Sequence, residues 1–225
     1  MFRHLGRILM LALLLLILFL VFNQSRSMAP SNQQETENFS RVSMENVNLR
    51  SYFPINDHWT YQFIGEGNEF AAFTREFRYT DEVLVQAFDT TSGGTVTAVY
   101  RITENEVALV SDFHEAETQE NRLSELSREA VAVDVILRQP LELGHTWASR
   151  NGQRQIVAVG EVVQVPAGAF YDVVVVKVDY GEDATHVGYE YYAKNIGLIK
   201  RDYQALNDDF DDFSVISQLQ QITFR

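Results

Sequence analysis

Apolar and polar side chains alternate with a period of two along most of the chain that follows Tyr52. Successive side chains of a β-strand point to opposite faces, so this alternation predicts half-buried strands with an apolar inner face and a wet outer face. On one face, one such segment carries Phe73, Arg75, Phe77 and Tyr79, and another carries Val96, Ala98, Tyr100 and Ile102.

Glycine-containing turns separate these segments at intervals of roughly ten residues, as in sandwiches and barrels. The strongest turn signal is Asn151-Gly152, because this pair supplies the two positive-φ residues of a type I′ hairpin turn. Long helical crossovers are missing, which favours antiparallel pairing. Valine-rich runs such as Val173–Val176 are apolar on both faces and predict strands that are covered on both sides.

The predicted fold is therefore all-β and mainly antiparallel, built as a strongly curved sheet, a sandwich or a half-barrel. One short helix is expected over Glu115–Ala130, where Leu123, Leu126 and Ala130 share one stripe and charged residues occupy the rest. This helix is expected to lie on the surface or to form a lid over the concave face.

The N-terminus has the layout of a secretory signal. Arg3 and Arg7 precede an unbroken apolar run from Ile8 to Phe22, which predicts that the rest of the chain crosses the membrane. The stretch Leu5–Phe22 also has the length of a membrane-spanning helix, so a cleaved signal and a retained anchor both remain open.

The predicted organisation has three parts. Residues 1–28 form a signal peptide or signal anchor, residues 29–50 form a flexible polar spacer, and residues 51–225 form the β domain. The predicted location is the cell membrane, with a single pass and the domain outside the cytoplasm, or the extracellular space after cleavage.

Charge and cysteine content narrow the range of partners. The chain has 31 acidic and 18 basic residues and a formal net charge of -13, and all the acidic residues lie at or after Glu35. Such a surface repels phosphate backbones, so nucleic acid is not an expected partner. The chain has no cysteine, which excludes disulfides and the lipid-modified cysteine of a lipoprotein. The N-terminal helix is then the expected contact with the membrane.

Three phrases occur in order along the domain: Tyr52-Phe53-Pro54 followed by Trp59-Thr60-Tyr61, then Pro166-Ala167-Gly168-Ala169-Phe170, then Tyr191-Tyr192-Ala193 followed by Gly197-Leu198-Ile199-Lys200. In these phrases the chain resembles a family of uncharacterised exported proteins of Gram-positive (Firmicutes-type) bacteria. The resemblance implies an exported all-β domain without an established enzymatic activity, and it brings no catalytic residues. The spacing from Pro54 to Trp59 is shorter than in the family, whereas the interval from Pro140 to Trp147 is longer and forms an internal echo.

The large aromatic residues of these motifs have two interpretations. Trp59, Trp147 and Phe170 lie near expected strand starts, where each can bury about 150–250 Å² as a core anchor. They could alternatively stack against a ligand. His58 and His145 flank the two tryptophans at equivalent points, which leaves a shared histidine site open, although exposed turn histidines are the commoner case.

No sequence pattern predicts catalysis. The chain lacks an H-E-x-x-H zinc motif, a G-x-S-x-G nucleophile elbow and a phosphate-binding glycine loop. An enzyme is therefore not expected, and neither is a cofactor. An acidic loop carries Asp208, Asp209, Asp211 and Asp212, whose carboxylates could bind calcium, or simply be solvated.

The sequence favours a non-catalytic extracytoplasmic module of the cell envelope that binds or scaffolds an unknown envelope component or small molecule. Two alternatives remain open. One is a carrier that holds a lipid or another apolar ligand against the concave face of the sheet. The other is a surface protein stabilised by calcium.

Overall fold

The computed structural model describes residues 48–113, 120–150, 152–206 and 214–225, which form one antiparallel sheet with two short 3₁₀ turns. The predicted leader and spacer up to residue 47 and the aspartates of the predicted calcium loop lie outside the described residues. The elements are η1 (Leu49–Ser51), β1 (Trp59–Glu66), β2 (Phe73–Thr80), β3 (Leu84–Thr91), β4 (Gly94–Ile102), β5 (Glu106–Phe113), η2 (Leu123–Glu125), β6 (Asp134–Arg138), β7 (Thr146–Ser149), β8 (Gly152–Val165), β9 (Gly168–Asp179), β10 (His186–Ala193), β11 (Gly197–Ala205) and β12 (Ser214–Phe224).

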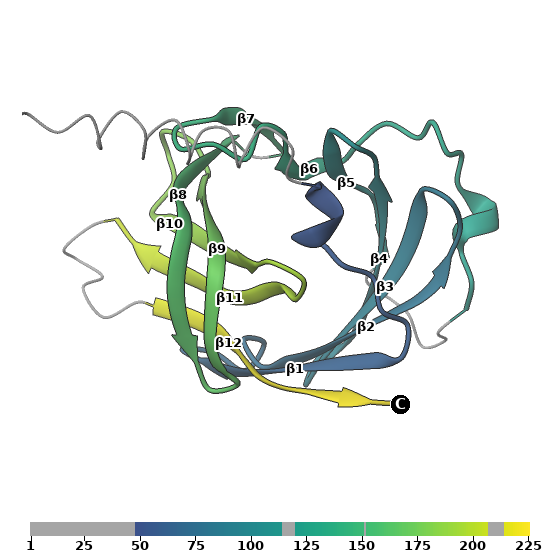
Figure 1. Cartoon of the computed structure of the whole chain (residues 1–225), viewed down its shortest axis with the longest axis horizontal. Helices are drawn as coiled ribbons and strands as arrows, with labels where there is room; N and C mark the ends of the chain where they lie inside the picture. The colour runs from purple at the N-terminus through teal and green to yellow at the C-terminus, as the bar shows by residue number, and fades with distance from the viewer. Residues whose placement is uncertain (1–47, 114–119, 151, 207–213) are drawn as a thin grey trace, which may run out of the picture. The chain divides into compact units, whose positions relative to one another are not determined.

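The sheet has twelve strands in the order β6-β5-β4-β3-β2-β1-β12-β11-β10-β9-β8-β7. Strands that follow each other in the sequence pair antiparallel, except that β6 does not pair with β7. β1 also pairs antiparallel with β12, which joins the two halves of the sheet. The sheet curls until its two edge strands, β6 and β7, come close to each other (Figure 1). The all-β, antiparallel, strongly curved fold predicted from the sequence is thus confirmed, as a nearly closed barrel rather than a two-layer sandwich.

Side chains join the two edges. The indole Nε1 of Trp147 on β7 donates a 2.8 Å hydrogen bond to the carbonyl oxygen of Val135 on β6. The Asp134 carboxylate accepts from the backbone N–H of Arg150 at 3.2 Å and from Nη2 of Arg154 at 3.1 Å. These bonds occupy part of the polar edge that an open sheet would expose. Trp59 and Trp147, which form the sequence echo, lie in β1 and β7, the first strands of the two halves β1–β6 and β7–β12.

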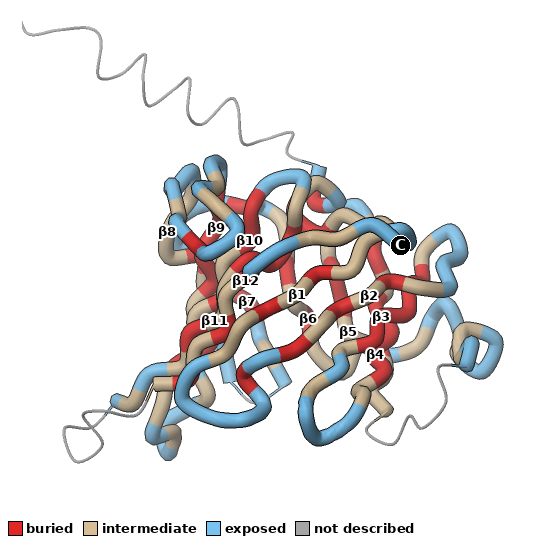
Figure 2. The backbone as a smooth tube through the Cα atoms, turned by 90° about the horizontal axis from the view of Figure 1, so that it is seen from below, coloured by how far each residue is buried: buried red, intermediate tan, exposed pale blue. Residues whose placement is uncertain are grey.

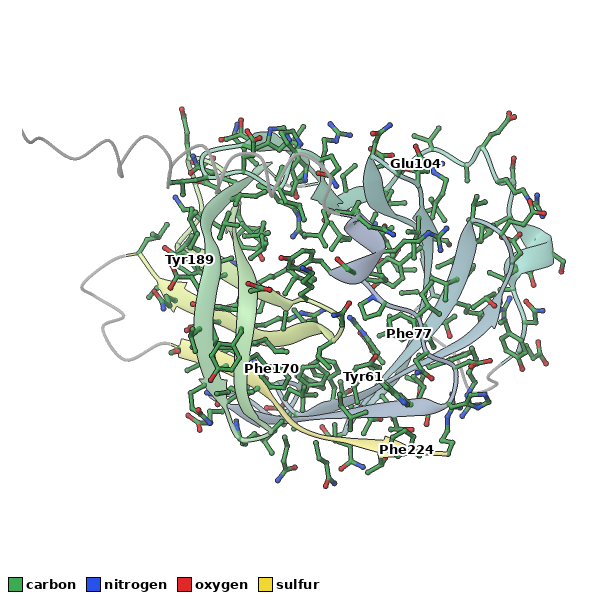
Figure 3. All side chains as sticks on the ribbon, viewed as in Figure 1. Tyr61, Phe77, Glu104, Phe170, Tyr189 and Phe224 are labelled. Carbon is green, nitrogen blue, oxygen red and sulfur yellow. The ribbon has the colours of Figure 1, made fainter. Side chains whose placement is uncertain are left out.

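Alternation along the strands builds the core. Buried and partly exposed positions follow each other along β1 and β2 (Figure 2). Inside the barrel the rings of Tyr61 and Phe77 meet edge to face with centroids 6.1 Å apart (Figure 3). The run Val173–Val176 is buried on both faces, as predicted.

The segment that precedes β1 fills one end of the barrel. Leu49, Tyr52 and Phe53 are each less than 5% exposed, and the η1 turn lies within the ring of strands (Figure 1). The ring of Phe53 lies 5.1 Å from that of Tyr100, and the backbone N–H of Asn195 donates to the Ser51 carbonyl oxygen. Residues 49 and 50, assigned to the spacer from the sequence, therefore belong to the packed domain.

This packing leaves almost no space at the filled end. The cavity between the Phe53-Pro54 segment and the surrounding strands has a volume of about 10 Å³. A single water needs about 10–15 Å³ of such space. At this end of the barrel, the chain's own aromatic side chains therefore leave no room for an apolar ligand.

The helix expected over Glu115–Ala130 is not formed in its described part, residues 120–130, which contain only the η2 turn. Leu123, Leu126 and Ala130 do share an apolar stripe, but it packs on Val99 and its neighbours on the outer face of the sheet. The segment is held there by Gln86, whose Nε2 donates to the Glu120 carbonyl oxygen at 2.7 Å. The expected lid over the concave face is therefore wrong, since this segment covers the opposite face (Figure 1).

The predicted β7–β8 hairpin is confirmed, with a register one residue from the expected one. Ser149 pairs with Gly152, so Gly152 belongs to β8 and is not part of the connection between the two strands. A Cβ at Gly152 would lie 2.1 Å from the carbonyl oxygen of Asp179, so this glycine serves a close approach between two chain segments.

No helix within the described ranges is long and apolar enough to cross a bilayer. The predicted Leu5–Phe22 helix is not among those residues.

Candidate functional site

The three aromatic residues singled out from the sequence do not form one site. Trp147 is 4% exposed and its indole N–H is bonded across the edges of the sheet. Trp59 packs edge to face against Tyr61 and Phe224, and Phe170 packs on the core from β9 (Figure 3). No ring contact joins any two of these three side chains, and each position is explained by packing.

The other sequence candidates are equally separate. His58 is largely exposed and lies 3.6 Å from Asp57, whereas His145 packs on Trp147. The structure describes no group of three or more histidine, aspartate or glutamate residues arranged to hold a metal ion. Asp208, Asp209, Asp211 and Asp212 lie outside the described residues, so calcium binding there stays a prediction.

A pocket of about 310 Å³ lies at the end of the barrel opposite η1. β1 starts beside the filled end and finishes at Glu66, and the pocket is built around the β1–β2 connection and the facing parts of β10, β11 and β12. Its lining residues are Asn68, Phe70, Ala71, Phe73, His186, Arg201, Tyr203, Val215 and Ser217.

Strand register explains why these side chains converge. Arg201 on β11 pairs with Ser217 on β12, and Ser217 pairs with Gly65 on β1, so the side chains of Arg201 and Ser217 share the inner face. A Cβ at Gly65 would lie 2.1 Å from the backbone nitrogen of Ala72. The absence of a side chain at Gly65 therefore lets the β1–β2 connection fold over this end of the barrel.

The Arg201 guanidinium is the main charged group of the pocket. Its carbon lies 5.3 Å from the ring centroid of Phe73, in a cation–π contact. The Phe73 ring is itself fixed by stacking on Phe63 at 4.3 Å. Among the described residues, Arg201 has no hydrogen-bond or ion-pair partner, and its Nε is buried without an acceptor.

Every other arginine in the described part of the chain donates to a carboxylate or carbonyl oxygen. Arg75 donates to Asp89 through Nε at 2.7 Å. Arg154 donates to Glu190 at 2.6 Å and to Asp134 at 3.1 Å. Asp89 and Glu190, whose charges act on Arg201, are thus already engaged by other guanidinium groups.

The buried side chains of Glu190 and Arg201 are both charged. Burial alone would raise the pKa of Glu190, but Arg154, Arg201 and the Tyr192 hydroxyl lower it below its ordinary value, so Glu190 is ionised. Burial, and next the charge of Arg75, act to lower the pKa of Arg201. Tyr203 and Glu190 are among the groups that raise it, and the net result is a pKa above the ordinary value. Arg201 therefore carries its positive charge at any physiological pH.

The remaining lining is mostly apolar and aromatic. Phe70 is 54% exposed at the rim, and a Cβ at Gly93 would lie 2.6 Å from its ring, so the ring rests on the bare backbone of the β3–β4 turn. The Ser217 hydroxyl donates to the carbonyl oxygen of Ala71 at 2.6 Å. Asn68 accepts from the backbone N–H of Phe70 through its side-chain oxygen at 2.9 Å.

Sequence reasoning did not identify this pocket, although the alternation contained a signal for it. Arg75 lies in phase with Phe73 and Phe77, Arg201 with Ile199, and Glu190 with Tyr192, so each charged residue occupies an inward position of its strand. A charged side chain at an inward position indicates a buried ion pair or a binding site. The pattern could not reveal which of the arginines lacks an acceptor.

No protein-family model and no curated protein matches the sequence. Among solved structures, one similar chain is a putative exported protein with a YmcC-like fold from Bacteroides fragilis NCTC 9343, with 16% identity, a TM-score of 0.45, and coverage of 76% of this chain and 97% of that one. A second is a putative lipoprotein from Parabacteroides distasonis ATCC 8503, with 14% identity, a TM-score of 0.43, and coverage of 76% of this chain and 98% of that one.

Proposed function

We propose that this chain is a non-catalytic binding module that acts outside the cytoplasm as part of the cell envelope, and that its ligand site is the pocket around Arg201. The observation that carries the proposal is the contrast between the two ends of the barrel. One end is filled down to about 10 Å³, whereas the other keeps about 310 Å³ open around a charged side chain. Small-molecule sites commonly occupy about 300–1,000 Å³.

The sequence supports the location. Arg3 and Arg7 followed by the apolar stretch Leu5–Phe22 are typical of an export signal, either cleaved or kept as an anchor. In the absence of cysteine, this stretch is the segment that would hold the domain at the membrane.

The lining of the pocket supports binding rather than catalysis. A nucleophilic serine requires a base within hydrogen-bond reach, but the Ser217 hydroxyl is engaged by the Ala71 carbonyl. Among the lining residues, His186 is the single imidazole, and its ring packs 4.7 Å from that of Tyr180. Glu190, which pairs with Arg201 across β10 and β11, is held ionised by Arg154 and the Tyr192 hydroxyl.

Location is tested by protease treatment of intact cells that express the full chain with an epitope after Arg225. The proposal predicts that the epitope is lost from intact cells, or appears in the medium if the signal is cleaved. Protection of the epitope in intact cells, with loss only after lysis, would contradict an extracytoplasmic domain.

Binding is tested by ligand-observed NMR with a fragment library containing acidic, neutral and basic small molecules. The two variants compared are Phe70→Ser at the pocket rim and Val131→Ser, whose parent side chain is 87% exposed in the segment on the outer face. The proposal predicts fragments that bind the unmodified protein and Val131→Ser equally but Phe70→Ser several-fold more weakly. A library without any binder, or with binders indifferent to Phe70→Ser, would remove the pocket as the site.

A further inference from the structure

We propose that the pocket recognises a small monocarboxylic acid with an aromatic or apolar body, and that Arg201 binds its carboxylate. This inference names the ligand class and rests on the proposed function of the pocket as a binding site.

The guanidinium N–H groups of Arg201 have no oxygen acceptor among the described residues. A guanidinium presents five N–H groups in a planar fork that matches the two oxygens of a carboxylate. A buried donor without an acceptor costs about 1–3 kcal/mol, which is why such donors are rare in native structures. Each of the other described arginines makes at least one hydrogen bond to an oxygen of the protein, although the Nε of Arg154 is also buried without an acceptor. Arg201 faces the pocket instead.

Its orientation is prepared before a ligand arrives. The guanidinium lies against the Phe73 ring, and the same ring lies 5.8 Å from the guanidinium carbon of Arg75. Arg75 is fixed in turn by its two hydrogen bonds to Asp89. A planar cation held on a fixed aromatic face loses little conformational freedom on binding, which favours affinity.

The charge balance favours a single negative charge on the ligand. Arg201 is the one lysine or arginine among the described lining residues, and Glu190 and Asp89 contribute negative potential at its guanidinium. The whole chain carries a formal net charge of -13. A phosphate dianion would meet one guanidinium and repulsion from the rest of the protein, whereas a carboxylate is matched in charge and in geometry.

The remaining lining fits an apolar or aromatic body. Phe70, Ala71 and Val215 contribute apolar surface, and Tyr203 contributes an aromatic ring. Tyr203 lies close to the backbone of Gly188, where a Cβ would approach the ring to 3.2 Å. The volume of about 310 Å³ accommodates a molecule with a single ring.

The experiment compares phenylacetate with its neutral isostere 2-phenylacetamide and with phenyl phosphate, each titrated into the purified domain and followed by NMR. Phenylacetate is expected to bind with a dissociation constant on the order of 1 mM. The amide and the phosphate ester are expected to bind at least several-fold more weakly. Acetate, which has the carboxylate without the ring, is expected to bind more weakly than phenylacetate.

The residue is tested with Arg201→Gln, Arg201→Lys and the control Arg128→Gln, which removes an exposed arginine paired with Asp81 and Glu82. Loss of a charge-assisted hydrogen-bonded pair should weaken phenylacetate binding by about 10- to 100-fold in Arg201→Gln. Arg201→Lys should weaken it less, and Arg128→Gln should leave it unchanged. Far-UV circular dichroism confirms that each variant is folded.

The outcomes separate the two proposals. Equal binding of acid and amide, or Arg201→Gln binding at wild-type affinity, would overturn the carboxylate inference and leave a pocket that binds other molecules. Failure of these probes and of every library fragment would overturn both. If Arg201→Gln does not fold, the comparison of acid, amide and phosphate ester on the unmodified protein decides the ligand class.

Discussion

Trp147 on β7 bonds to the carbonyl oxygen of Val135 on β6 through its indole N–H, at 2.8 Å, and so links two strands that are not joined as a regular ladder. The contact lies where the two edge strands of the twelve-stranded sheet approach each other. One end of the resulting barrel is filled by the segment from Leu49 to Pro54, and the other holds the pocket.

Substitution Trp147→Phe keeps an aromatic ring and removes the N–H donor. The Val135 carbonyl oxygen is then left without that donor in a buried position, so unfolding should become easier by about 1–3 kcal/mol. Urea denaturation followed by circular dichroism measures the change. A loss no larger than that of Trp59→Phe, at the start of β1, would show that the bond across the edges contributes nothing specific.

The buried pair of Arg75 and Asp89 provides a second prediction. Arg75→Met leaves the partly buried Asp89 carboxylate without its partner, and loss of one member of a buried pair costs about 3–5 kcal/mol. The double variant Arg75→Met/Asp89→Leu should recover most of that stability, because no charge is left unpaired. Urea midpoints for the two single variants and the double variant complete the cycle, and additive losses would contradict coupling between these residues.

Stability should also depend on pH through Glu190. Burial acts to raise its pKa, but Arg154, Arg201 and Tyr192 outweigh burial and lower the folded-state pKa below the ordinary value of 4.5. A carboxyl group with a lowered pKa stabilises the fold above its unfolded-state pKa, and the contribution is lost as the pH falls through the folded-state value.

Glu190→Gln should therefore be less stable than the wild type at pH 7, and the difference should shrink as the pH falls below about 4.5. Thermal unfolding measured at intervals from pH 7 to pH 3 tests this. A difference that is constant over the whole range would exclude Glu190 as a source of the pH dependence.

Leu49 tests whether the segment before β1 belongs to the folded unit. It is 1% exposed, so Leu49→Ala should cost about 2–5 kcal/mol, as is usual for buried leucine truncations. Val131→Ala, at a position 87% exposed, should change the stability by less than about 0.5 kcal/mol. Equal urea midpoints for these two variants would contradict the filling of this end of the barrel.

Much of the fold could be predicted from local patterns. Alternation around Phe73 and around Ala98 identified strands and their inner faces, because the two-residue period of a strand is independent of tertiary context. The Asn151-Gly152 pair located a hairpin, but Gly152 lies in β8, where it approaches the carbonyl oxygen of Asp179, and the register differs by one residue from the expected one. That approach involves a distant segment and leaves no local signal.

The helix and the pocket depended on long-range contacts. The stripe of Leu123, Leu126 and Ala130 has a helical spacing, yet Gln86 and the outer face of the sheet hold residues 120–130 in an irregular form with a single 3₁₀ turn. The proposed role of the pocket rests on a difference between two arginines: Arg201 has no acceptor, whereas Arg154 has two. Glu190 and Asp134 reach Arg154 only through the arrangement of the strands in the sheet. Composition and residue spacing therefore could not predict which arginine lacks an acceptor.

The most direct test of the account is the mapping of backbone amide shifts in a ¹H–¹⁵N spectrum of the domain during titration with phenylacetate. The account predicts that the largest shifts fall on residues around the pocket, such as Ala71, Phe73, Arg201 and Ser217. Shifts concentrated at the opposite end, around Ser51, Phe53 and Asn195, or no shifts with this acid, would contradict it.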